Sequence, residues 1–153
     1  MISLKKSILF LFCSVIVICF FAGQGSAAAQ GQITWANTYG GSGYERATSI
    51  QQTADGGYIV AGEADQTDTG PTDIWVLKLG SDGNIQWQKT YGGSSGDYQP
   101  SIQQTTDGGY IVAGVTDSFG AGIQDIWVLK LGSDGNIQWQ KTYGGSGYDW
   151  AAS

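Results

Sequence analysis

The chain has 153 residues, of which 25 are glycine, 2 are proline and none is histidine; its formal net charge is −6. The length allows one small domain, and the lack of histidine excludes Ser-His-Asp and Cys-His catalysis and histidine-bound zinc. The only cysteines, Cys13 and Cys19, lie in a segment that we expect to be removed. We therefore expect no cofactor, and only oxygen ligands remain for a metal, which favours calcium or magnesium.

The N-terminus has the pattern of a secretory signal. Lys5 and Lys6 precede an apolar run over residues 8–22, and small and polar residues follow. This pattern predicts a signal peptide over residues 1–29, cut after Ala29. The apolar run is shorter than the roughly 20 residues that a membrane-spanning helix needs. We expect a protein that is secreted or displayed at the cell surface, without a membrane anchor after cleavage.

The rest of the chain is a repeat with a period of 52 residues. Trp35, Trp87 and Trp139 mark the period, and the 22 residues from Asp73 to Ser94 recur unchanged from Asp125. A period of this length indicates a solenoid, a propeller or an array. The repeat region spans residues 30–153, with complete units at 45–93 and 97–145. Partial units at 33–41 and 147–153 flank them.

Each complete unit predicts four strands. In the first unit they cover residues 47–53, 58–62, 73–79 and 85–91, with turns at the Asp-Gly pairs between the first two and the last two strands. The third strand is apolar on both faces, which suits a sheet packed between two others. Four antiparallel strands per unit indicate a β-propeller blade. The predicted fold is all-β, with two complete propeller blades and a partial strand at each end, that is, an incomplete propeller.

The repeat resembles a known family. The blocks Gly-Gly-Ser-Gly, Asp-Gly-Gly-Tyr-Ile-Val-Ala-Gly and Asp-Ile-Trp-Val-Leu-Lys-Leu are similar to the bacterial and archaeal β-propeller repeats called SBBP repeats. The resemblance covers the chain from about residue 33 onward. It implies an exported or surface protein with no general enzymatic assignment.

Two blades do not close a propeller, which needs typically 4–8 blades. Three interpretations remain open: a fragment of a longer propeller, a subunit that forms a ring by association, and a self-standing pair of sheets. One blade face should pack on the next blade, while the outward pair of faces finds no partner in a monomer. The residues expected at blade faces are Tyr58, Trp75, Val76 and Leu77, with Tyr110, Trp127, Val128 and Leu129 as their counterparts.

The segments that differ between the units map to one end of the predicted blades, where recognition is usually located. The net charge gathers there too, which argues against nucleic acid and allows a protein or glycan partner. The acidic residues at this end are Glu45, Glu63, Asp65, Asp68, Asp73, Asp97, Asp117, Asp125 and Asp149. Solubility and drift in tolerant loops are the plainer explanations. The aromatic candidates for ligand contact are Tyr44, Tyr98, Phe119, Tyr148 and Trp150.

Two site hypotheses are weaker. Glu63, Asp65, Asp68 and Asp73 are close enough in sequence to suggest a calcium site, although solvated loop acids explain them as well. A propeller glycoside hydrolase needs two carboxylates in different environments, which near-identical units do not offer. We therefore expect a non-catalytic binding or structural module, with a ring-forming glycan-binding protein as the alternative.

Overall fold

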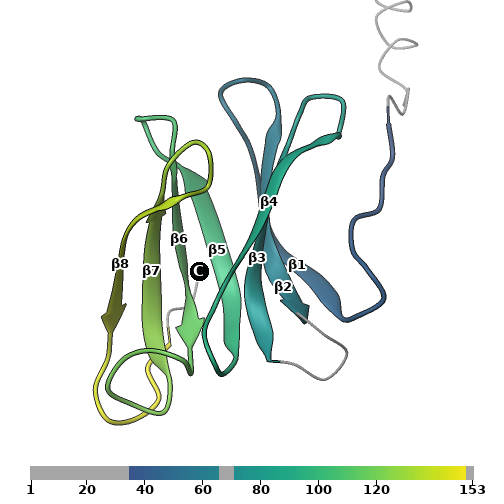
Figure 1. The fold of residues 1–153 in the computed structure, drawn as a ribbon. Coiled ribbons are helices and arrows are strands. Elements are labelled where there is room, and N and C mark those ends of the chain that lie inside the picture. Colours follow the sequence, from purple (N-terminus) through teal and green to yellow (C-terminus); the bar gives the residue numbers. More distant parts are fainter. Residues whose placement is uncertain (1–34, 66–70, 151–153) are drawn as a thin grey trace, which may run out of the picture. The chain divides into compact units, whose positions relative to one another are not determined.

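The computed structural model describes residues 35–65 and 71–150, which fold into two antiparallel four-stranded sheets (Figure 1). The first sheet contains β1 (Glu45–Gln52), β2 (Tyr58–Asp65), β3 (Thr72–Leu79) and β4 (Ile85–Tyr91). The second contains β5 (Asp97–Gln104), β6 (Tyr110–Thr116), β7 (Asp125–Leu131) and β8 (Ile137–Tyr143). No helix occurs in the described ranges, so the all-β class is confirmed. The predicted signal peptide at 1–29 lies outside the described residues.

The turns form where the Asp-Gly pairs predict them. Gly56 and Gly83 have φ angles of 81° and 78°, in the left-handed region that glycine enters without steric cost. The Asp55 carboxylate accepts a hydrogen bond from the backbone N–H of Gly57 at 3.0 Å. Strand β4 matches its predicted range residue for residue, whereas β1 begins two residues earlier and β2 ends three residues later than predicted.

The two sheets pack on each other through what we call their inner faces. The first sheet contributes Ile59, Ala61, Ile74 and Val76, and the second contributes Ile102, Tyr110, Val112, Trp127, Leu129 and Leu131. Successive side chains of a strand point to opposite faces. Because Ile74 and Val76 face the second sheet while Trp127 and Leu129 face the first, the two units use opposite faces of the same strand. This arrangement explains why β3 and β7 are apolar on both faces.

Residues 35–41 form no strand, although the repeat predicts one over 33–41. A strand needs a hydrogen-bonded neighbour, and this segment has no ladder partner among the described residues. It lies instead against the β3–β4 turn, where the Trp35 indole N–H donates to Ser81 O at 3.0 Å and the Tyr39 hydroxyl to Gly83 O at 2.5 Å. The segment thus occupies, against the first sheet, the place that β4 occupies against the second.

The opposite faces, here called the outer faces, are covered unequally. On the first sheet Leu77 is buried, and Trp35 packs edge-to-face on Tyr58 with ring centroids 5.9 Å apart. On the second sheet, Trp139 and Tyr143 of β8 are exposed. We expected both outer faces to lack a partner. This expectation is wrong for the part of the first sheet next to the β3–β4 turn, because residues 35–39 cover it.

Candidate binding pocket between the two sheets

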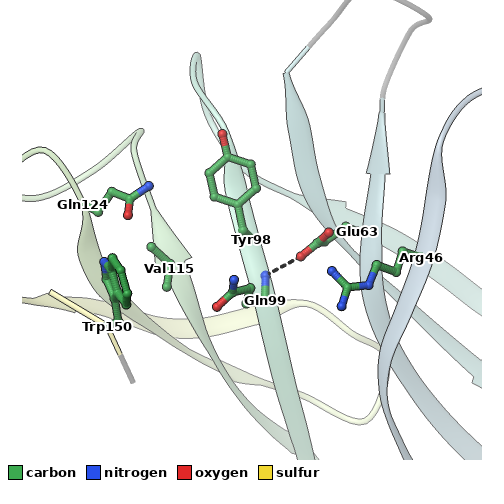
Figure 2. Close-up of a pocket in the computed structure, with 7 residues that line it drawn as sticks. All are labelled: Arg46, Glu63, Tyr98, Gln99, Val115, Gln124 and Trp150. Atoms are coloured by element: carbon green, nitrogen blue, oxygen red, sulfur yellow. Dashed lines mark hydrogen bonds between the residues drawn. The ribbon is translucent and has the colours of Figure 1, made fainter. Parts of the chain in front are cut away.

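A pocket of about 250 Å³ opens between the two sheets (Figure 2). Its lining residues combine one cation, one carboxylate, two amides and two aromatic rings, and they come from β1, β2, β5, β6 and the segments beside β7 and after β8. They are Arg46, Glu63, Tyr98, Gln99, Val115, Gln124 and Trp150. A mixture of aromatic and hydrogen-bonding side chains around a concave site is the usual composition of a small-molecule site.

One of the lining residues, Gln99, has a strained backbone conformation. Gln99 has a φ of 50°, which is uncommon for a residue with a side chain and costs about 1–3 kcal/mol. It lies in the irregular part of β5, between Tyr98 and Ser101, where the pairing register with β6 shifts. The buried Glu63 carboxylate accepts a hydrogen bond from the Gln99 backbone N–H at 2.8 Å, so the bond joins the two sheets and holds the strained backbone.

Arg46 and Glu63 lie opposite each other on β1 and β2. Figure 2 shows both side chains on the first-sheet side of the pocket, with Gln99 next to them. One guanidinium and one carboxylate give the lining a balanced formal charge. The pocket therefore suits a polar ligand without a net charge better than a strongly charged one.

The pocket is lined by equivalent positions of successive repeats. Arg46, Tyr98 and Trp150 are separated by 52 residues each, and Glu63 and Val115 by the same interval. All five line the pocket, and every one of them differs from its equivalents. By contrast, 22 consecutive residues of the repeat are identical in both units. The third and fourth strands of the two units are thus identical from Asp73 and Asp125 onward, whereas the side chains that face the pocket differ.

The two aromatic residues of the lining, Tyr98 and Trp150, have different surroundings. Burial raises the pKa of the Tyr98 phenol, and the neighbouring Asp117 carboxylate adds to the shift. The segment that carries Trp150 is tied to the second sheet by the Asp149 backbone N–H, which donates to Gln124 O at 2.9 Å. Trp150 itself is 70% exposed, so most of its ring is accessible to a ligand.

Among the predicted aromatic contacts, only Tyr98 and Trp150 line this pocket. Tyr44 and Tyr148 are exposed but do not line it. Phe119 packs on Trp127, with ring centroids 5.0 Å apart, and thereby covers the second sheet. The lining residues that sequence reasoning missed are Arg46, Gln99, Val115 and Gln124. The signal that could have found Arg46 is the position it shares with Tyr98 and Trp150, which differs in every unit.

Three of the four proposed calcium ligands lie in the described residues, and each of them has other surroundings there. Glu63 binds the Gln99 backbone, Asp65 accepts from the Thr72 hydroxyl at 2.7 Å, and Asp73 is buried at the start of β3. Asp68 lies outside the described residues. Within the described ranges, no group of three or more acidic, histidine or cysteine residues could hold a metal ion.

The acidic end is less exposed than its sequence suggests. Four of its acids, Glu63, Asp73, Asp97 and Asp125, are buried. A recurring contact explains part of this: a carboxylate caps each Gly-Gly pair by accepting a hydrogen bond from the second glycine. The bonds are Gly41 N to Glu45 at 3.0 Å, Gly93 N to Asp97 at 3.0 Å and Gly145 N to Asp149 at 2.8 Å. These acids therefore serve the turns between sheets.

Asp97 illustrates the consequence of that burial. Its Oδ2 atom accepts from Gly93 N and from the Ser118 hydroxyl at 2.9 Å, while its Oδ1 atom has no hydrogen-bond donor in the described part of the chain. Burial raises the pKa of this carboxyl group, and the charge of nearby Asp73 raises it further.

No model of a known protein family matches the chain, and no curated protein matches it. In residues 35–65 and 71–150, no helix is long and apolar enough to cross a membrane.

Proposed function

We propose that this chain is an exported, non-catalytic binding module made of β-propeller blades, and that the pocket between its sheets binds a glycan. The observation that carries the proposal is the divergence of the lining at equivalent repeat positions, on sheets that are otherwise near-identical. Binding residues are found disproportionately on variable segments that a rigid scaffold positions. The sequence resemblance to SBBP propeller repeats and the predicted signal peptide support the exported, blade-based part of the proposal.

The chemistry of the lining favours a sugar. Tyr98 and Trp150 offer rings that can contact the apolar face of a pyranose, while Gln99 and Gln124 offer both donors and acceptors for hydroxyl groups. The guanidinium of Arg46 and the carboxylate of Glu63 can bind further hydroxyls. Glu63 is the only carboxylate in the lining, whereas most glycoside hydrolases use two. Binding without turnover is therefore the expected behaviour.

Titration with soluble glucose-, mannose- and N-acetylglucosamine-based oligosaccharides, followed by calorimetry, tests the proposal. We expect one of these series to bind, with no new reducing ends after prolonged incubation. Trp150→Ala should weaken binding by about tenfold, as expected for an aromatic anchor worth roughly 1.4 kcal/mol. Tyr148→Ala is the matched control, because Tyr148 is an exposed aromatic of the same segment that does not line the pocket.

If both variants lose the same glycan affinity, the glycan does not bind in this pocket, and that part of the proposal is wrong. Binding accompanied by new reducing ends would favour the hydrolase instead. If none of the three oligosaccharide series binds, the glycan assignment is wrong, and the module then recognises another class of partner.

A further inference from the structure

One contact of a tryptophan and a tyrosine with a β-turn occurs twice in the described chain. The Trp87 indole N–H donates to Ser133 O at 3.1 Å, and the Tyr91 hydroxyl donates to Gly135 O at 2.6 Å. Trp35 and Tyr39, 52 residues earlier, make the same bonds to Ser81 O and Gly83 O. In both places the tryptophan also packs edge-to-face on the tyrosine that begins the second strand of the sheet, Tyr110 or Tyr58. A Trp-x3-Tyr pair on a Ser-Asp-Gly-Asn turn is thus the repeating contact.

The third Trp-x3-Tyr pair has no such turn among the described residues. Trp139 and Tyr143 of β8 are 43% and 51% exposed, whereas Tyr91, the counterpart of Tyr143, is only 6% exposed. The side chains beside them on β6 and β7 are Ile111, Ala113, Ile126 and Val128, and each is half-buried. Their counterparts in the first sheet, Ile59, Ala61, Ile74 and Val76, are all 0% exposed. The difference arises from packing alone, because these strand residues are identical in the two units.

The other half of the same interface is present at the opposite side of the molecule. Ile102 of β5 is buried against the first sheet, with 2% exposure, while its counterpart Ile50 of β1 is 66% exposed. In the same sheet, the Ser81–Asn84 turn is occupied by residues 35–39, which bind it through side chains and without a strand ladder. One outer face therefore carries the Trp-x3-Tyr pair, and the other carries the turn and the isoleucine that complement it.

We infer that this chain associates head to tail with a second copy of itself, with Trp139 and Tyr143 of one copy binding the Ser81–Asn84 turn of the next. The incoming β8 replaces residues 35–39, which act as an intramolecular cover of that turn. The β8 strand has the advantage over the cover, because it belongs to a sheet and brings the apolar residues of β6 and β7 with it. Such a heterologous contact produces a ring if the rotation closes and a filament if it does not.

The inference depends on the proposal that the two sheets are consecutive blades, but it does not depend on the glycan pocket. The pocket residues lie at the interface inside one chain, so a glycan titration and an association measurement can fail separately. The experiment is analytical ultracentrifugation of the purified full chain and its variants over a range of concentrations. We expect the wild-type chain to associate as its concentration rises.

Two variants should each remove one half of the contact. Trp139→Ala with Tyr143→Ala leaves the turn side intact, and Ile50→Lys leaves the β8 side intact. Each variant alone should remain a monomer, and an equimolar mixture should form dimers and nothing larger. Both changes are at exposed positions, so folding is not at risk, and circular dichroism would verify it. Trp150→Ala is the control and should associate as the wild-type chain does.

A third variant distinguishes displacement of the cover from a simple loss of apolar surface. Trp35→Ala removes the main anchor of the cover, so the turn becomes free more often and the apparent dissociation constant should fall. The inference is overturned if the wild-type chain stays monomeric up to its solubility limit, or if the β8 double variant associates as the wild type does. A mixture that forms no dimer, or an unchanged or weaker association of Trp35→Ala, would also contradict it.

Discussion

At the scale of single residues, two carboxylates in different environments respond to pH in opposite ways. Asp97 is buried, whereas Asp55 is exposed. Burial raises the pKa of Asp97. By contrast, the hydrogen bonds from Thr53, Lys78 and the Gly57 backbone hold the pKa of Asp55 well below its usual range. Asp97 belongs to the acidic end expected from the sequence and Asp55 does not, and the structure places the two carboxylates in different environments.

Asp97→Asn should raise the free energy of unfolding near neutral pH. A carboxyl group with a raised folded-state pKa favours the folded protein at low pH, and this advantage is lost as pH rises through the folded-state pKa. The neutral amide does not carry that penalty and keeps an oxygen acceptor for Gly93 N. Urea unfolding at about pH 7 and about pH 5 checks it: the gain over wild type should shrink on acidification.

Asp55→Asn is the control with the opposite sign. Its lowered pKa means that ionised Asp55 stabilises the fold above the usual carboxyl range and that this stability is lost as pH falls. Lys78, whose side chain is 5% exposed, loses its ion-pair partner at 2.9 Å in this variant. The variant should therefore be less stable than wild type near pH 7, with a difference that narrows on acidification. Identical pH dependence in both variants would contradict the assignment of their environments.

At the scale of elements, identical sequences have different surroundings. Strands β4 and β8 have the same seven residues, Ile-Gln-Trp-Gln-Lys-Thr-Tyr, but only β4 contacts the turn of another sheet. Glycine allows that contact: the Cβ that a side chain would add at Gly135 would lie 2.9 Å from the Trp87 ring, and its φ of 76° is strained for other residues. The repeat thus offers a comparison of one residue in two environments.

Trp87→Ala should destabilise the chain by about 3 kcal/mol, the lower end of the range for removing a packed tryptophan, because Trp87 is only half-buried. Trp139→Ala, at the equivalent position on β8, should change the stability of the dilute monomer by less than about 0.5 kcal/mol. Chemical unfolding of both variants at low concentration measures the difference. Equal losses would mean that the two sheets do not pack as described.

The regular elements could be predicted from the sequence because alternation and Asp-Gly turns are local signals. The range of β4 and the two-sided burial of β3 followed directly from them. Residues 35–41 could not be predicted correctly, because a strand depends on a neighbour that local sequence does not reveal. The pocket was predicted only in part: Tyr98 and Trp150 were chosen as aromatics of variable or terminal segments, whereas Gln99 required the backbone irregularity of β5. Glu63 was considered as a calcium ligand because its partner, the Gln99 backbone, lies 36 residues away and is not visible in the local sequence.

At the scale of the whole molecule, the repeat can form the same interface between every pair of successive units. It occurs once in full between the two sheets, and its two halves lie on the outer faces. Stability in such a protein is approximately the sum of unit terms and nearest-neighbour terms. In the proposed propeller, each added unit would contribute a further interface, and closing the ring would remove the last two open faces. A self-standing pair of sheets would gain nothing comparable from added units.

Thermal unfolding of chains with two, four, six and seven copies of the 52-residue unit measures how much each added interface stabilises the protein. We predict a low midpoint for two copies and a steep rise with each addition, followed by a plateau once the ring closes. A two-copy chain that is monomeric and melts cooperatively at the same temperature as the longer chains would show that the sheets are complete without further blades, and would contradict the account.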